Sequence, residues 1–123
     1  MTKLIGYMEG ADPAWLTILQ VKGYNTMPLS NGMDGHGQHI RLISDHVRPD
    51  LIICYLHKLV PPEEAEFTVE ELLLPAKLYS IPVLVVCPAA YHTEAAKLLP
   101  PLGNGVELVD PSTVLDKANQ HLL

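Results

Sequence analysis

The sequence predicts a three-layer α/β/α sandwich around a mainly parallel, five-stranded sheet. Apolar runs of strand length alternate with segments of helical periodicity five times along the chain. The run at residues 50–56, DLIICYL, is apolar almost throughout, which is typical of a parallel strand covered on both faces. At 123 residues, with no internal repeat or linker, the chain is expected to form a single domain spanning residues 1–123.

The N-terminal third begins with a predicted strand, KLIGYM, at residues 3–8. Asp12 then suits a helix N-cap, and Pro13 suits the first helical position, so a helix is predicted up to Lys22 and Gly23. A weaker strand, YNTMPL, follows at residues 24–29.

A second helix is predicted after a glycine-rich segment. Ile40, Ile43 and Val47 recur at helical spacing, and Pro49 marks the expected end of this helix.

The second half continues the alternation after the strand at residues 50–56. A polar loop, HKLVPPEEAE, leads to Thr68 and Glu71, which have the spacing of a capping box and predict a helix towards Tyr79 with a kink at Pro75. The remaining predicted elements are a strand at 81–87, a short helix at 93–99, a strand at 105–110 and a terminal helix opened by Asp110-Pro111.

Composition restricts the possible partners. The formal net charge is -6 and the eight Lys and Arg residues are scattered, which argues against binding to nucleic acid. An apolar content of 48% favours a homo-oligomer. Cys54 and Cys87 each lie at the end of an apolar run, where isolated cysteines are usually buried. Such free thiols suggest a reducing compartment. With no signal peptide and no membrane-spanning run, a cytoplasmic protein without membrane contact is expected.

The segment NGMDGHGQHIRLIS, residues 31–44, is the main candidate for a binding site. Its glycines allow close backbone approach to a ligand, and a following helix would offer unpaired N–H groups to an anion. In parallel sheets, ligands bind at the carboxyl ends of the strands, where this segment falls. A small anionic metabolite bearing phosphate or carboxylate is the predicted ligand, and a polar turn is the alternative. The predicted ligand-binding residues are Gly10, Asn31, Gly32, Gly35, His36 and His39.

The polar residues also suit two other chemistries. Asp34, His36 and His39 have the donors of a metal site, but the usual zinc spacings are missing, so neither a metal nor a cofactor is expected. His57 ends the strongest strand and begins a loop that holds Glu64. A histidine beside carboxylates can act as a general acid or base, although a solvated loop has the same composition.

The run LSNGMDGHGQHIRLISDHVRPDLIIC, with LLLPAKLYSIPVLVV after it, resembles the methylglyoxal synthase-like superfamily. That group includes methylglyoxal synthase and the allosteric domain of carbamoyl phosphate synthetase. The resemblance covers about residues 25 to 90 and implies a three-layer fold, a site for small phosphorylated metabolites and frequent oligomerisation. The matching positions are Gly32, Gly35, Gln38, Ile40, Asp50, Ile81, Pro82 and Val83.

The catalytic residues of the synthase are not carried over. Gly37 stands where the family has its aspartate, and Pro62, Glu63 and Glu64 stand near its later Pro-His-Asp. A diverged carbon-oxygen lyase would therefore need Asp34 as base, with His57 or Glu64 in place of the lost histidine.

Two other interpretations remain open. The helix around residues 69–79 is similar to that of nucleoside deoxyribosyltransferase-like proteins, but Leu72 occupies the position expected for the catalytic glutamate, and Glu71 is one residue away. The strand at 50–56 resembles that of receiver domains, with Cys54 or Tyr55 in place of the phosphorylated aspartate. Phosphorelay signalling is therefore disfavoured, which leaves a noncatalytic oligomeric interaction module as the second interpretation.

Overall fold

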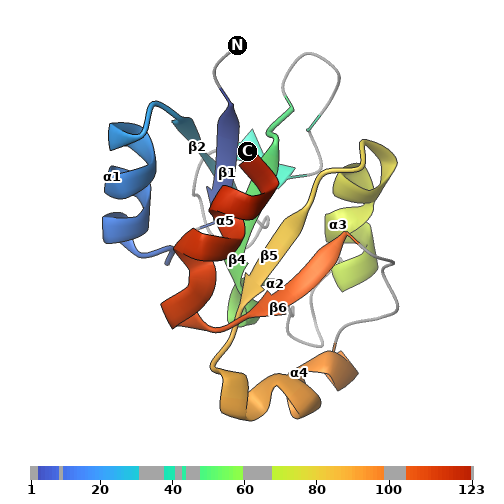
Figure 1. Ribbon diagram of the computed structural model, residues 1–123. Helices are drawn as coiled ribbons and strands as arrows, with labels where there is room; N and C mark the ends of the chain where they lie inside the picture. The colour runs from blue at the N-terminus through green and yellow to red at the C-terminus, as the bar shows by residue number, and fades with distance from the viewer. Residues whose placement is uncertain are drawn as a thin grey trace.

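The computed structural model describes residues 3–8, 10–30, 38–40, 43, 48–59, 68–98 and 105–122. Its centre is a six-stranded sheet with the order β3-β2-β1-β4-β5-β6, and all strand pairs are parallel. The predicted α/β sandwich is confirmed, because helices cover both faces of this sheet (Figure 1). The strands are β1 (Leu4–Met8), β2 (Asn25–Ser30), β3 (Gln38–His39), β4 (Leu51–Tyr55), β5 (Val83–Val86) and β6 (Val106–Val109).

Four of the α-helices lie where helices are predicted, whereas α2 (Leu56–Leu59) lies at the end of a predicted strand and the start of a predicted loop. The α-helices are α1 (Pro13–Val21), α2 (Leu56–Leu59), α3 (Val69–Leu78), α4 (His92–Leu98) and α5 (Val114–Leu122). Two short 3-10 turns, η2 (Ala89–Tyr91) and η3 (Pro111–Thr113), lead into α4 and α5. Among the described residues, no helix is both long and apolar enough to cross a membrane.

Two apolar clusters hold the layers together, one on each face of the sheet. On one face, Leu72 and Leu73 of α3 pack with Ile52 and Cys54 of β4. On the other face, the neighbouring β4 residues contribute to the cluster that α1 and α5 cover. All of Leu51 to Cys54 is fully buried, as the continuous apolar run predicts for a central parallel strand.

Side-chain caps begin two of the α-helices, at the positions that the sequence predicts. The Asp12 carboxylate accepts a hydrogen bond from the Ala14 N–H at 2.9 Å, before the first turn of α1. The Thr68 hydroxyl accepts one from the Glu71 N–H at 3.2 Å, before α3. Each cap satisfies an N–H that has no partner within its own helix, so these residues fix where the helices begin.

The structure differs from the prediction after the glycine-rich segment. Gln38 and His39 form an additional strand, β3, which pairs with Leu29 and Ser30 of β2. Of the helix predicted between Ile40 and Pro49, the structure describes Ile40, Ile43 and Arg48, and neither Ile43 nor Arg48 is helical.

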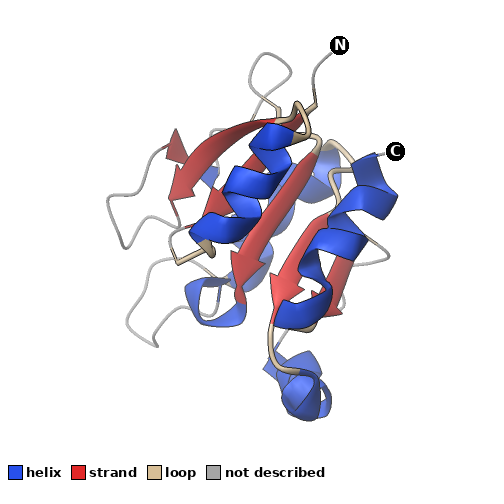
Figure 2. Cartoon of the chain, turned by 60° about the vertical axis from the view of Figure 1, so that its left-hand side comes forward, coloured by secondary structure: helices blue, strands red, loops and turns tan. Residues whose placement is uncertain are grey.

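The connection between β5 and β6 also departs from the common arrangement. Helix α4 lies beyond the carboxyl ends of the strands instead of covering a face of the sheet (Figures 1 and 2). Only Ala95 of α4 is buried. Helix α4 therefore adds its polar residues to the edge of the sheet where ligands bind in this class of fold.

Candidate functional site

The strand order reverses direction between β1 and β4, and in this class of fold the carboxyl ends at such a point form the ligand-binding crevice, here called the β1–β4 crevice. The chain moves from β1 to β2 on one side and later returns to β4 on the other side of β1. At such a switch point the two following connections run in opposite directions and leave space for a ligand. Strand β4 pairs with β1 from Leu51 to Ile53, so the residues after Met8 and after Ile53 meet at this edge.

Gly10 lies in the turn after β1, with a φ of +94° that side chains rarely tolerate. A Cβ atom at this position would lie 3.7 Å from Cδ2 of Tyr55 and 3.9 Å from Cε of Lys58. The turn after β1 is therefore in van der Waals range of the residues that close β4 and begin α2. The Lys58 ammonium is one bond beyond Cε, so a positive charge lies close to the Gly10 turn.

Three aromatic rings form a row at the same edge. The Trp15 and Tyr55 ring centroids are 5.8 Å apart, and the Tyr55 and His57 centroids are also 5.8 Å apart. Trp15 is buried and Tyr55 is half-buried, whereas His57 is exposed. The row therefore runs from the apolar core to solvent, with an imidazole at its outer end.

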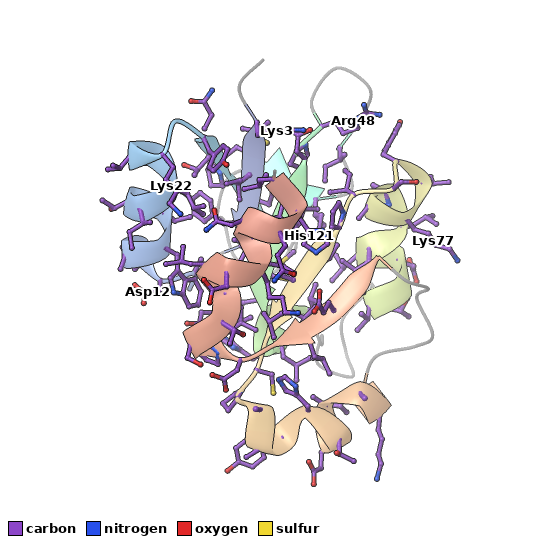
Figure 3. The ribbon with its side chains drawn as sticks, in the orientation of Figure 1. Lys3, Asp12, Lys22, Arg48, Lys77 and His121 are labelled. Atoms are coloured by element: carbon purple, nitrogen blue, oxygen red, sulfur yellow. The ribbon has the colours of Figure 1, made fainter. Side chains whose placement is uncertain are left out.

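Asp12 adds a negative charge beside this row, at the carboxyl edge of the sheet (Figure 3). Burial, and then the charge of Asp12, raise the pKa of the Tyr55 phenol above its ordinary value. Tyr55 is therefore a neutral hydroxyl group at physiological pH. The Asp12 carboxylate also occupies the first free N–H of α1, so an anion in the crevice would depend on Lys58 more than on the helix end.

The structure places the predicted site residues unequally. Gly10 and His57 lie at the ends of adjacent strands, β1 and β4, and Tyr55 connects them through its contacts. His39 lies in β3, two strands away from β1, which is about 10 Å at the usual spacing. The other predicted residues lie outside the described part of the chain: Asn31, Gly32, Asp34, Gly35, His36 and Glu64.

Sequence reasoning did not single out Tyr55 and Lys58 as site residues. Both follow the best-predicted strand, but their importance depends on the pairing of β4 with β1. The available signal was the row of polar and aromatic residues, Tyr55, His57 and Lys58, directly after an apolar run.

A second polar cluster lies at the ends of β5 and β6. The Asp110 carboxylate accepts hydrogen bonds from the Ala89 N–H at 2.8 Å and from the Ser112 N–H at 3.0 Å. A ring nitrogen of His92, Nε2, lies 2.7 Å from the Cys87 carbonyl oxygen. These hydrogen bonds attach the start of α4 to the ends of β5 and β6, so the cluster stabilises the fold. Helix α4 begins at His92, one residue before the predicted start.

The structure describes some of the residues that a metal site or a deoxyribosyltransferase-like enzyme would need. Within the described segments, no group of three or more His, Cys, Asp or Glu side chains is arranged to hold a metal ion. Leu72 is buried in the core, while Glu71 is exposed and bonded to the Thr68 hydroxyl at 3.3 Å. A glutamate in this position faces solvent beside its own helix cap.

No protein-family model matches this chain, and no curated protein matches it significantly. The resemblance to methylglyoxal synthase-like proteins therefore depends on the quoted residues alone. The strand order and the short distances around Gly10 are the stronger guide to function.

Proposed function

We propose that this protein binds a small metabolite bearing phosphate or carboxylate at the crevice between β1 and β4. The observation that supports this most is that Tyr55 Cδ2 and Lys58 Cε lie 3.7 and 3.9 Å from the place a Cβ atom would take at Gly10. A glycine allows a ligand to approach the backbone closely, and Lys58 supplies the positive charge. His57, exposed at the outer end of the aromatic row, is a further group that such a ligand could contact.

The resemblance to methylglyoxal synthase-like domains supports the same class of ligand. Its sites for phosphorylated metabolites lie at the carboxyl ends of strands, where the β1–β4 crevice also lies. Binding of a metabolite is compatible with a sensor or with a diverged lyase. Since the lyase would depend on Asp34 or Glu64, outside the described residues, the proposal is one of binding.

A thermal shift screen tests this proposal directly. The panel contains inorganic phosphate, triose and hexose phosphates, nucleotides and small carboxylic acids, each added to the full chain. A true ligand raises the melting temperature in proportion to the logarithm of its concentration. Trp15 is the only tryptophan and contacts Tyr55, so its fluorescence gives a second measure of binding.

The matched variants are Lys58→Gln in the crevice and Lys22→Gln at the exposed position just past α1. Loss of a charged hydrogen-bond donor should raise the dissociation constant about tenfold or more for Lys58→Gln. Lys22→Gln should bind as the wild type does. The proposal is wrong if no anion raises the melting temperature, or if both variants bind equally well.

A further inference from the structure

The outer surface of α3 carries apolar side chains that the core does not use. Glu71, Leu74, Pro75 and Leu78 are spaced i, i+3, i+4 and i+7, so they form one stripe along the helix. Leu74 is 51% exposed and Leu78 is 69% exposed, although the opposite side of α3 is packed in the core. Because Leu74, Pro75 and Leu78 are neighbours on one side of the helix, they form a contiguous apolar patch, which can mark an interaction surface.

A hollow lies next to these leucines. Its volume is about 260 Å³, and it is lined by Ile43, Glu71, Leu74, Pro75, Leu78 and Tyr79. An apolar cavity of about 150 Å³ can hold a benzene molecule, so this hollow can receive a leucine side chain. The stripe therefore offers both protruding leucines and a space that accepts one.

Opposite charges mark the two ends of the stripe. Glu71 lies in the first turn of α3, and the Arg48 guanidinium lies 5.8 Å from the Tyr79 ring centroid, just past the last turn. Figure 3 shows Arg48 near this end of α3 and Lys77 on the side of the helix. The surface is thus acidic at the helix start, apolar in the middle and basic at the helix end.

We propose that this surface binds a second copy of the same chain, with the two α3 helices antiparallel across a two-fold axis. An axis near Leu74 and Pro75 places Glu71 of each copy beside the partner's Arg48. The same arrangement directs the leucines of each copy to the hollow of the other. This surface is negative at one end, apolar in the middle and positive at the other end. It is complementary to a copy of itself only when the two α3 helices run in opposite directions.

Sedimentation equilibrium of the full chain over a range of concentrations tests the role of the leucines. The wild type should show a monomer–dimer equilibrium, and Leu78→Asp should raise the dimer dissociation constant more than about tenfold. Val21→Asp is the matched control, because Val21 is 82% exposed on α1, which covers the other face of the sheet. Circular dichroism verifies that both variants are folded.

Charge reversal tests the two-fold arrangement itself. Glu71→Arg and Arg48→Glu should each weaken the dimer, because each places like charges together at two symmetric positions. The double variant should recover most of the wild-type affinity, which a damaged helix cap could not do. The proposal is overturned if the wild type stays monomeric, even if this surface binds an unrelated protein. A dimer insensitive to Leu78→Asp, or a double variant without recovery, overturns it too.

Discussion

Gly6 in the middle of β1 has no room for a side chain. A Cβ atom there would lie 2.6 Å from Cδ1 of Leu29 and 3.3 Å from Cγ of Pro49. Leu29 is fully buried, so it can move only by disturbing its own neighbours. We expect Gly6→Ala to lower the free energy of unfolding by about 1–3 kcal/mol, measured by urea denaturation.

Gly105→Ala is the control for this substitution. The nearest atom to a Cβ at Gly105 would be the Ile81 carbonyl oxygen at 3.8 Å, which is an ordinary contact. Equal destabilisation by the two substitutions would show that close packing at Gly6 is not the cause.

Cys54 is expected to be chemically inert in the folded protein. Burial raises the pKa of its thiol to about 12, and Sγ lies 3.9 Å from the Leu84 carbonyl oxygen. The reactive thiolate is therefore scarce at pH 8. Iodoacetamide at pH 8 should leave Cys54 unmodified in the native protein and label it in denaturant, as peptide mass spectrometry would show. Rapid labelling of native Cys54 would contradict its burial.

At the scale of elements, Asp110 connects β6 to both α4 and α5 and should make their attachment sensitive to acid. Hydrogen bonds from the Ser112 hydroxyl, the Ala89 N–H and the Ser112 N–H lower the pKa of this carboxylate from 3.8 to about 2. Because the folded-state pKa is depressed, the stabilisation is complete well above pH 4 and is lost as the pH falls towards 2.

Comparison with Asp110→Asn measures this contribution. The variant should be less stable than the wild type at pH 7, and the difference should shrink between about pH 4 and pH 2, where the wild-type carboxylate takes up its proton. Thermal melts at several pH values provide the measurement. A difference that does not change with pH would mean that the charge of Asp110 has no role in its hydrogen bonds.

The five predicted strands are present, and β1, β4 and β5 are the most predictable because each is an apolar run buried between two helical layers. Strands β2 and β6 are only partly buried, so their apolar signal is weaker. Strand β3 and helix α2 were missed for a physical reason. A strand of two polar residues and a helix of four residues are too short to show a period. Ile40 and Ile43 fit a helical spacing, but both are simply buried in the core beside β2.

The candidate site could be predicted only in part. Gly10 and His57 follow apolar strands, so their place at the carboxyl edge could be inferred from the alternation of elements. The meeting of Lys58 and Tyr55 with Gly10 depends on β4 lying next to β1. The pairing of β4 with β1 depends on the packing of the whole sheet, so no local sequence pattern predicts it.

At the scale of the whole molecule, the two apolar clusters share the strands between them. Ile52 and Cys54 belong to one cluster, while Leu51 and Ile53, from the same strand, belong to the other. Loss of either helical layer would expose β4, so the two sides should unfold together. We expect Trp15 fluorescence and far-UV circular dichroism to give the same urea midpoint. Two separate midpoints would show that the layers unfold independently.

The shortness of β3 has a consequence for how chains behave at high concentration. Among the described residues, β3 covers the outer side of β2 only at Leu29 and Ser30, so the preceding part of β2 lies at the rim of the sheet. An uncovered rim is a template for amyloid-like stacking of partly unfolded chains. Pro28 lies in this stretch and has no N–H to donate, so it interrupts the ladder that such a fibril would need.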